Sequence, residues 1–451
     1  MAEIAPWIDS VSSASTKFEA RECESSSRSG GRKKRTRRSE QIRRVRPRLL
    51  SPARPTSIHD SPEDSSDDAS ETKSTADASS SSSSPSAISS GPCWNIEPTS
   101  FTRLDSQTLE RNPRVLLQQC NPPIRIRQPD RDTQIASADK LEEILSDGFA
   151  TGFIPSYYKD HFQEADSRAL RSIKPHMFDP KELSPREKDL LETLWDRMET
   201  IYDRAKRCND NSKDKNAWAR VVWDVLETVI ENDSGCLEIN DVQSQAIHPN
   251  FLPRDKSGKA VSATVDLVLA FSGNTDSNVR QVYENHRSGS FDATLSPMTD
   301  VYTGRLLHAC AIQVEAHGGK PMEAEMRLAV YHAAMLRKMQ ETIIMTWEGI
   351  DIDAEAERLI PSMVGWTVIG HKWSLYISSL LPDGSILCQG PFDELEASTS
   401  TRQGVLLLLD LVERVATMSS EILWPIMREQ LVGNGLKGWL HYFEAAKADK
   451  S

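Results

Sequence analysis

Two apolar segments near the middle of the chain each hold an acidic residue where a strand is expected. In residues 261–271 the apolar side chains alternate with Asp266, and in the later segment Gln313, Glu315 and His317 stand at every second position. Side chains two residues apart in a strand lie on one face. The three polar residues of the later segment should therefore share a face. A carboxylate is costly to bury unless something pairs with it.

Two strand carboxylates with a third polar group two residues on are the arrangement that a metal-dependent nuclease uses. Asp266 and Glu315 would hold a hard cation such as Mg²⁺ or Mn²⁺ through their oxygens. Gln313 would position water or ligate through its carbonyl, and His317 would orient the attacking water or neutralise the phosphate. The alternative is that both carboxylates stand at strand ends and face solvent. This alternative stays open because Glu-x-His is a motif of low specificity.

Composition narrows the class of protein. The chain has 451 residues and a formal net charge of −12. No apolar run reaches the length of a membrane span, and the N-terminus lacks a secretory pattern, so we expect no membrane association. The seven cysteines form no Cys-x-x-Cys pair. They indicate reduced thiols in an intracellular protein, with neither a disulfide framework nor a zinc site.

The charge is unevenly distributed. Residues 31–48 carry ten basic residues and one acidic residue, so the rest of the chain is strongly acidic. This argues against broad electrostatic binding of nucleic acid by the folded part, although a locally basic cleft could still bind DNA. Two basic clusters favour a nuclear import signal that binds an import receptor: Arg32, Lys33, Lys34, Arg35, Arg37, Arg38, Arg43, Arg44 and Arg46. The alternative is a solvated basic tail on a cytoplasmic protein.

Changes in residue composition divide the chain into three parts. Residues 1–107 hold the basic run and an unbroken serine tract, and they bury too little apolar surface to fold. Residues 108–214 form a helical lead-in, and residues 215–445 form the core. The core alternates helices and strands, which predicts an α/β fold with a mixed central sheet flanked by helices.

Periodicity places the elements. Helices are expected over 113–120, 139–145, 216–231, 321–340, 401–419 and 424–443, and a capping box, Ser184-Pro-Arg-Glu187, opens another. Met322 and Met326 should point inward from the helix over 321–340. Strands are expected over 261–271, 306–317 and 364–369 and in a hairpin over 373–377 and 385–388, with residues 272–303 as a long loop. Glu227 lies on the polar side of its helix and is an accessory metal-ligand candidate; a solvated helix face is the alternative.

The order of these motifs resembles that of the fungal PD-(D/E)XK nuclease-like domain proteins. The resemblance covers about residues 110–440. It rests on five segments in order: Trp218-x-x-x-Val222-x-x-x-Leu226, Val265-Asp266-Leu-Val-Leu, Ile312-Gln-Val-Glu315-Ala-His317-Gly-Gly319, Glu325-Met-Arg-Leu328, and Gly365-Trp-Thr-Val-Ile-Gly-His371-Lys-Trp373. It implies a restriction-endonuclease-like core after a helical lead-in and a disordered N-terminus.

The family's catalytic pattern carries over unevenly. The resemblance assigns metal binding to Asp266 and Glu315, with Mg²⁺ or Mn²⁺ as cofactor. His317 stands where the family has lysine, and a histidine with an ordinary pKa of about 6.5 is mostly neutral at pH 7. Lys320, three residues further, is a candidate substitute, and Arg327 stands where the family has glutamine.

Two functions therefore remain open from the sequence. One is a metal-dependent phosphodiesterase that acts on DNA through Asp266, Glu315, Gln313 and His317. The other is a nuclease fold without turnover that binds nucleic acid or a nuclear protein partner. The intact acidic pair favours the first, and the missing lysine and the acidic body favour the second.

Overall fold

The computed structural model describes residues 101–103, 113–129, 135–165, 167–181, 184–231, 236–289, 294–346 and 360–432. The predicted import run and serine tract lie outside these residues. Within the predicted N-terminal tail the described residues are 101–103. They form strand β1 (Phe101–Arg103), which pairs in parallel with β6 (Ala260–Ser262) in a small separate sheet.

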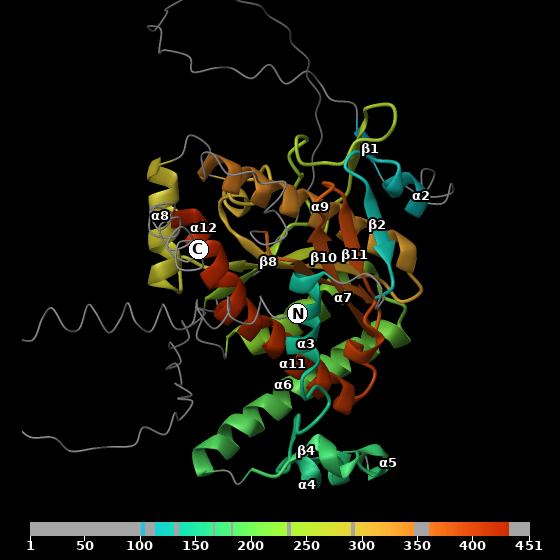
Figure 1. Ribbon diagram of the computed structural model, residues 1–451. Helices are drawn as coiled ribbons and strands as arrows, with labels where there is room; N and C mark the ends of the chain where they lie inside the picture. Colours follow the sequence, from blue (N-terminus) through green and yellow to red (C-terminus); the bar gives the residue numbers. More distant parts are fainter. Residues whose placement is uncertain are drawn as a thin grey trace, which may run out of the picture. The chain divides into compact units, whose positions relative to one another are not determined.

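The main sheet of the described residues has eight strands in the order β2-β11-β10-β9-β8-β7-β5, with β12 paired to β10 (Figure 1). Its strands are β2 (Ile124–Arg127), β5 (Leu237–Asp241), β7 (Leu267–Phe271), β8 (His308–Glu315), β9 (Met363–Ile369), β10 (Lys372–Leu380), β11 (Ile386–Gln389) and β12 (Ala397–Ser398). The β8–β9 and β11–β2 pairs are parallel and the other pairs are antiparallel. The predicted α/β fold with a mixed central sheet is confirmed.

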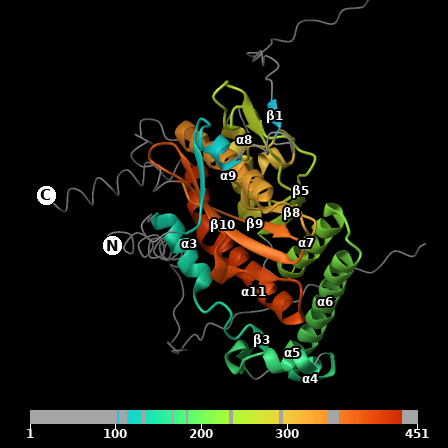
Figure 2. The ribbon, with the colours of Figure 1, turned by 90° about the vertical axis from the view of Figure 1, so that its right-hand side faces the viewer.

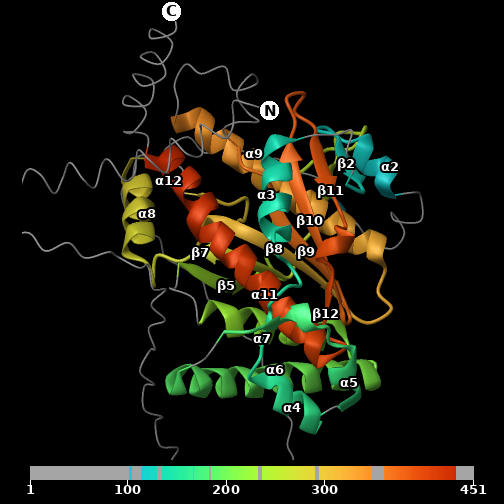
Figure 3. The ribbon, with the colours of Figure 1, turned by 60° about the horizontal axis from the view of Figure 1, so that its bottom comes forward.

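Helices cover both faces of this sheet. They are α2 (Pro113–Gln118), α3 (Ala136–Ser146), α4 (Tyr158–Ala165), α5 (Ser167–Ser172), α6 (Pro185–Asp210), α7 (Lys215–Ile230), α8 (Ser277–Gly289), α9 (Pro321–Thr346), α11 (Arg402–Met418) and α12 (Trp424–Val432). Helix α9 packs on β8, β9 and β10, whereas α3 packs on β10, α7 on β8, and α11 on both helices (Figure 3). Because both faces are covered, β7 and β8 are buried along almost their whole length, and β7 is entirely apolar.

Shorter elements complete the chain. Strands β3 (Ile154–Pro155) and β4 (Phe178–Asp179) pair with each other beside α4 and α5. Single 3₁₀ turns span Pro175–Met177, Thr303–Arg305 and Asp393–Leu395, and a π-helical turn, Ser419–Leu423, joins α11 to α12. No described helix has both the length and the apolar character that crossing a membrane requires.

The capping box that opens α6 is confirmed. The Glu187 N–H donates to Ser184 Oγ at 3.3 Å, and the Ser184 N–H donates to the Glu187 carboxylate at 2.9 Å. Pro185 occupies the first helical position, where its missing N–H costs nothing. From this start α6 runs side by side with α7, as Figure 2 shows.

The expected single strand over 261–271 is two strands. Residues 260–262 pair with β1 in the small sheet, while β7 begins at Leu267 and joins the main sheet. Asp266 therefore stands just before β7 and not inside a regular strand. The later strand also ends earlier than expected, because β8 stops at Glu315 and His317 lies in the following turn.

Two further expectations were wrong. Residues 272–303 hold helix α8, which is rich in polar and charged residues; its buried apolar side chains include Val279 and Val282. Met322 is 42% exposed, whereas Met326 is buried as predicted. Met322 lies in the first turn of α9. The predicted helix over 424–443 is described only as far as Val432.

A buried histidine ties α9 to the sheet. His332 Nδ1 lies 2.8 Å from Ser378 Oγ on β10, and a Cβ on Gly365 would lie 2.6 Å from its Nε2, so only glycine fits there. Burial lowers the pKa of His332 from 6.5 to about 3. The folded state thus keeps this imidazole neutral at a pH where the unfolded chain protonates it.

We predict that His332 makes the fold acid-sensitive. Because the unfolded state binds the extra proton, the unfolding free energy should fall as the pH drops below 6.5. His332→Gln should make this dependence shallower by about 1.4 kcal/mol per pH unit between roughly pH 6 and 4. Urea unfolding across this range measures the slope, with the exposed His176→Gln as control. Equal slopes for His332→Gln and wild type would contradict the prediction.

Candidate active site

Asp266 is anchored across two strands. Its backbone N–H donates to the Ile312 carbonyl at 3.0 Å, and its Oδ2 accepts the Val314 N–H at 2.6 Å. The side chain is almost completely buried, with the residue 2% exposed. These bonds to β8 fix one carboxylate oxygen and leave Oδ1 directed elsewhere.

Glu315, the last residue of β8, lies beside it. Its Oε1 accepts a hydrogen bond from Gln313 Nε2 at 3.1 Å, as expected for side chains two residues apart on one strand face. Its carbonyl accepts the Gly370 N–H at 3.1 Å, which ties the end of β8 to the turn after β9. The carboxylate is half-buried, so it is better solvated than that of Asp266.

Lys215, which stands just before the helix expected over 216–231, joins the two carboxylates. Lys215 is the first residue of α7, behind the helix cap Asp214. Its Nζ lies 2.8 Å from Asp266 Oδ1 and 3.8 Å from Glu315 Oε1. A cation in the first turn of a helix opposes the helix dipole. The acidic pair offsets this cost. A lysine in the first turn of a helix is unfavourable by itself, and this was the sequence feature that could have identified Lys215 as a site residue.

Burial dominates the electrostatics of Asp266. It raises the pKa of the Asp266 carboxyl above its ordinary value, although the Lys215 ammonium and the Val314 N–H oppose the rise. The negative charge of Glu315 raises this pKa further. The fold thus maintains a charged carboxylate at a cost in stability, as is common at functional sites.

Gln313 is the buried polar group of the site. It is fully buried on β8, and its Nε2 also donates to the Val314 carbonyl at 3.2 Å. Among the described residues its Oε1 has no hydrogen-bond partner. A buried amide oxygen without a donor is uncommon and calls for an explanation such as an ion or water.

These donors fit a magnesium or manganese ion. Asp266 Oδ1, Glu315 Oε2 and Gln313 Oε1 are hard oxygen atoms, which such cations prefer. The described part of the chain has no cluster of three or more His, Cys, Asp or Glu side chains placed to hold a metal. A cation that keeps several waters and uses one or two carboxylates needs no such cluster.

His317 lies at the rim and not on the face of the pair. It is exposed in the turn after β8, and a Cβ on Gly370 would lie 3.1 Å from its Cβ. Its charge adds to burial in lowering the pKa of His371, whose ring packs edge-on against Trp218 of α7. Among the described residues no polar contact joins His317 to Asp266 or Glu315. The expected shared face ends at Glu315 because the strand ends there.

The structure does not bring Lys320 or Glu227 to the pair. Lys320 is exposed, and its carbonyl accepts the N–H groups of Glu323 and Ala324 at the start of α9. Glu227 lies about 18 Å along α7 from Lys215, at 1.5 Å per residue. Its Oε1 accepts the Trp223 Nε1–H at 3.2 Å.

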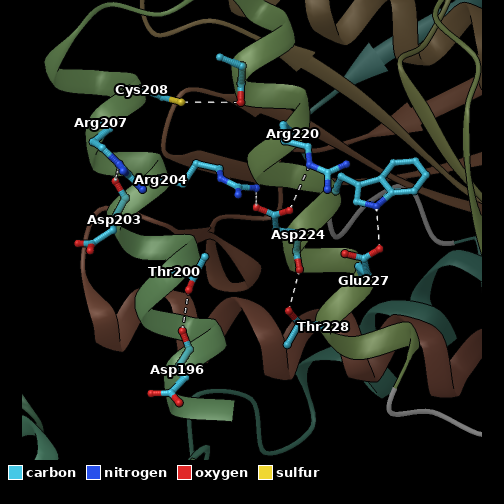
Figure 4. A network of polar contacts seen from close by, with 12 residues as sticks. Asp196, Thr200, Asp203, Arg204, Arg207, Cys208, Arg220, Asp224, Glu227 and Thr228 are labelled. Atoms are coloured by element: carbon cyan, nitrogen blue, oxygen red, sulfur yellow. Dashed lines mark hydrogen bonds and ion pairs between the residues drawn. The ribbon is translucent and has the colours of Figure 1, made fainter. Parts of the chain in front are cut away.

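Figure 4 shows the polar contacts between α6 and α7, where Glu227 points away from α6. Asp224 binds Arg204 of α6, and its second oxygen lies 3.5 Å from Arg220. Thr228 Oγ1 donates to the Asp224 carbonyl at 2.7 Å. Asp224 therefore helps to hold the two helices together, and α7 contributes to the site through its N-terminus. The structure does not place Glu227, the expected accessory ligand, beside the acidic pair.

The mixed sheet, with an acidic pair at the ends of two adjacent strands and a lysine between them, defines a nuclease-type core. Residues 163–424 match the family model of the PD-(D/E)XK nuclease superfamily, so the chain belongs to this superfamily. The match includes Lys215, Asp266 and Glu315, and it begins inside the predicted lead-in. No curated protein and no solved structure matches the chain.

We predict that removing the buried charge stabilises the protein. Because the pKa of Asp266 is raised, its charged form lowers stability above that pKa. Asp266→Asn should raise the Tm by a few degrees at pH 7 to 8. Its amide oxygen can still accept the Val314 N–H, and Lys215 can turn to solvent.

Thermal unfolding measures the effect, with the exposed Asp196→Asn as the matched control. The gain should vanish in acid, below the ordinary aspartate pKa of 3.8, where the wild-type carboxyl is neutral too. A lower Tm for Asp266→Asn would mean that attraction to Lys215 outweighs the cost of burial.

Proposed function

We propose that this protein is a metal-dependent phosphodiesterase that acts on DNA. The observation that carries the proposal is the contact of Lys215 Nζ with both Asp266 and Glu315. Because His317 stands at the position of the family's lysine, the sequence showed no fixed cation beside the two carboxylates. Here a helix and not the strand provides it.

Each residue then has a task. Asp266 and Glu315 hold Mg²⁺ or Mn²⁺, which when bound supplies Lewis-acid activation of the phosphodiester and of water. Lys215 stabilises negative charge on the phosphate, since a fixed cation in a water-poor site acts strongly. Gln313 orients Glu315 through its amide N–H. The exposed His317 contacts the nucleic-acid strand at the rim.

A specific observation favours a second candidate, a binding module without turnover. The ammonium of Lys215 already neutralises the acidic pair without a metal. In that case the same surface, with the exposed Lys213 and Lys320, binds nucleic acid or a nuclear protein electrostatically. The acidic pair is then structural, and its charge is balanced within the fold.

We predict Mg²⁺- or Mn²⁺-dependent cleavage of plasmid or single-stranded DNA that EDTA abolishes. Glu315→Gln and Lys215→Met should each lower the cleavage rate at least about a hundredfold, the usual loss for a group that stabilises transition-state charge. Glu227→Gln is the matched control and should keep wild-type activity. Single-turnover gel assays measure the rates, and fluorescence anisotropy measures DNA binding by the same variants.

The outcomes separate the two candidates. If wild type and Glu315→Gln bind DNA equally and neither cleaves it, the protein is a binding module without turnover. A large gain in the cleavage rate from His317→Lys would show that catalysis needs the cation at position 317 and that Lys215 does not replace it.

We also propose that the basic run over residues 32–48 directs nuclear import. Deleting it should lower the nuclear-to-cytoplasmic ratio of a fluorescent fusion several-fold and leave the Tm of the purified protein unchanged. Deletion of the serine tract over 79–84 is the control. An unchanged distribution after removal of the basic run would favour a solvated tail on a cytoplasmic protein.

A further inference from the structure

Two of the four oxygens of the acidic pair accept hydrogen bonds from uncharged groups. Asp266 Oδ2 accepts the Val314 N–H, and Glu315 Oε1 accepts the Gln313 amide. Asp266 Oδ1 and Glu315 Oε2 remain for a cation, and Lys215 Nζ already lies 2.8 Å from Asp266 Oδ1. A metal ion that used Asp266 Oδ1 together with a Glu315 oxygen would therefore compete with the Lys215 ammonium for Asp266 Oδ1.

We infer that Lys215 gates this site by competing with the divalent cation for the two carboxylates, and that cation binding moves the ammonium toward the substrate phosphate. The inference rests on the proposed function and adds an order of events to it. The physical reason is repulsion. A dication and an ammonium at one buried carboxylate repel each other strongly, because little water screens them.

The position of Lys215 allows this exchange. Its side chain is 29% exposed and has a flexible four-carbon stem. Its backbone is held at the start of α7, where Asp214 Oδ1 accepts the Ala217 N–H at 3.1 Å. The neighbouring Lys213 and Asn216 are exposed, so the ammonium can swing outward without unfolding the helix.

The burial of Asp266 and Gln313 explains why the site needs a cation before the metal binds. Asp266 is too buried to be left as an unpaired charge, and Gln313 Oε1 is buried without a donor among the described residues. Without the metal, Lys215 compensates the acidic pair. A bound metal would take over that compensation, and Gln313 Oε1 would be available as a further oxygen ligand. A phosphate that receives the displaced ammonium should then strengthen metal binding, because coupling between two ligands is reciprocal.

The test is Mn²⁺ affinity, measured by calorimetry on the full-length protein without DNA. Lys215→Met should bind Mn²⁺ about tenfold or more tightly than wild type, because the competing charge is gone. Lys213→Met removes the same charge two residues away and should leave the affinity unchanged. Lys215→Arg keeps the charge and should bind no more tightly than wild type.

Stability gives a second reading. Mn²⁺ should raise the Tm of Lys215→Met more than that of wild type, because binding stabilises in proportion to affinity. If Lys215→Met does not fold without metal, Lys215→Gln, whose amide can donate to Asp266, takes its place.

Tighter Mn²⁺ binding by Lys215→Met or Lys215→Gln, with Lys213→Met unchanged, supports the gate. Equal affinities for wild type and all variants would overturn the gate and leave the metal-dependent function standing. Absence of Mn²⁺ binding by every protein would overturn both the gate and the metal-dependent function.

Discussion

The structure depends on one buried negative charge. Asp266 stands before β7 with almost no exposure to solvent, and a lone carboxylate there would destabilise the fold strongly. The neighbours compensate it: the Val314 N–H from β8, and the Lys215 ammonium from α7. Burial still raises its pKa, so the compensation is partial. Buried charges of this kind cluster at functional sites, whereas a fold selected for stability alone would place an amide or an apolar side chain at this position.

Helix α7 has two roles that its charge pattern separates. Its acidic residue Asp224 lies on the side that meets α6, where Arg204 binds it, and Glu227 accepts a hydrogen bond from Trp223 of α7 itself. Its apolar residues pack on β8 and β5, and its N-terminus delivers Lys215 to the acidic pair. The contacts with α6 and with the sheet hold the helix axis in place. The lysine can therefore be mobile while its anchor is fixed.

The sequence predicted the features that depend on local pattern. Apolar runs located the strands around Asp266 and Glu315, and the capping box located the start of α6. It could not predict where β7 begins, because residues 260–262 pair with β1, far away in the chain. It also could not identify Lys215, since nothing in Asp214-Lys215-Asn216 shows that two distant strands end beside it. Glu227 attracted attention as an acidic residue on the right helix, but it lies at the wrong end.

The origin of the lysine matters for how the site can be controlled. A lysine two residues after Glu315 on the same strand would be fixed beside the carboxylate by the backbone, with or without metal. In this chain the strand ends at Glu315, and the position of that lysine is an exposed histidine in a turn. Lys215 comes from a separate helix, and its only described bonds to the strands are through its ammonium. Its position is therefore set by charge and not by chain connectivity. A change of charge at the acidic pair is sufficient to release it, which couples occupation of the site to the placement of its cation.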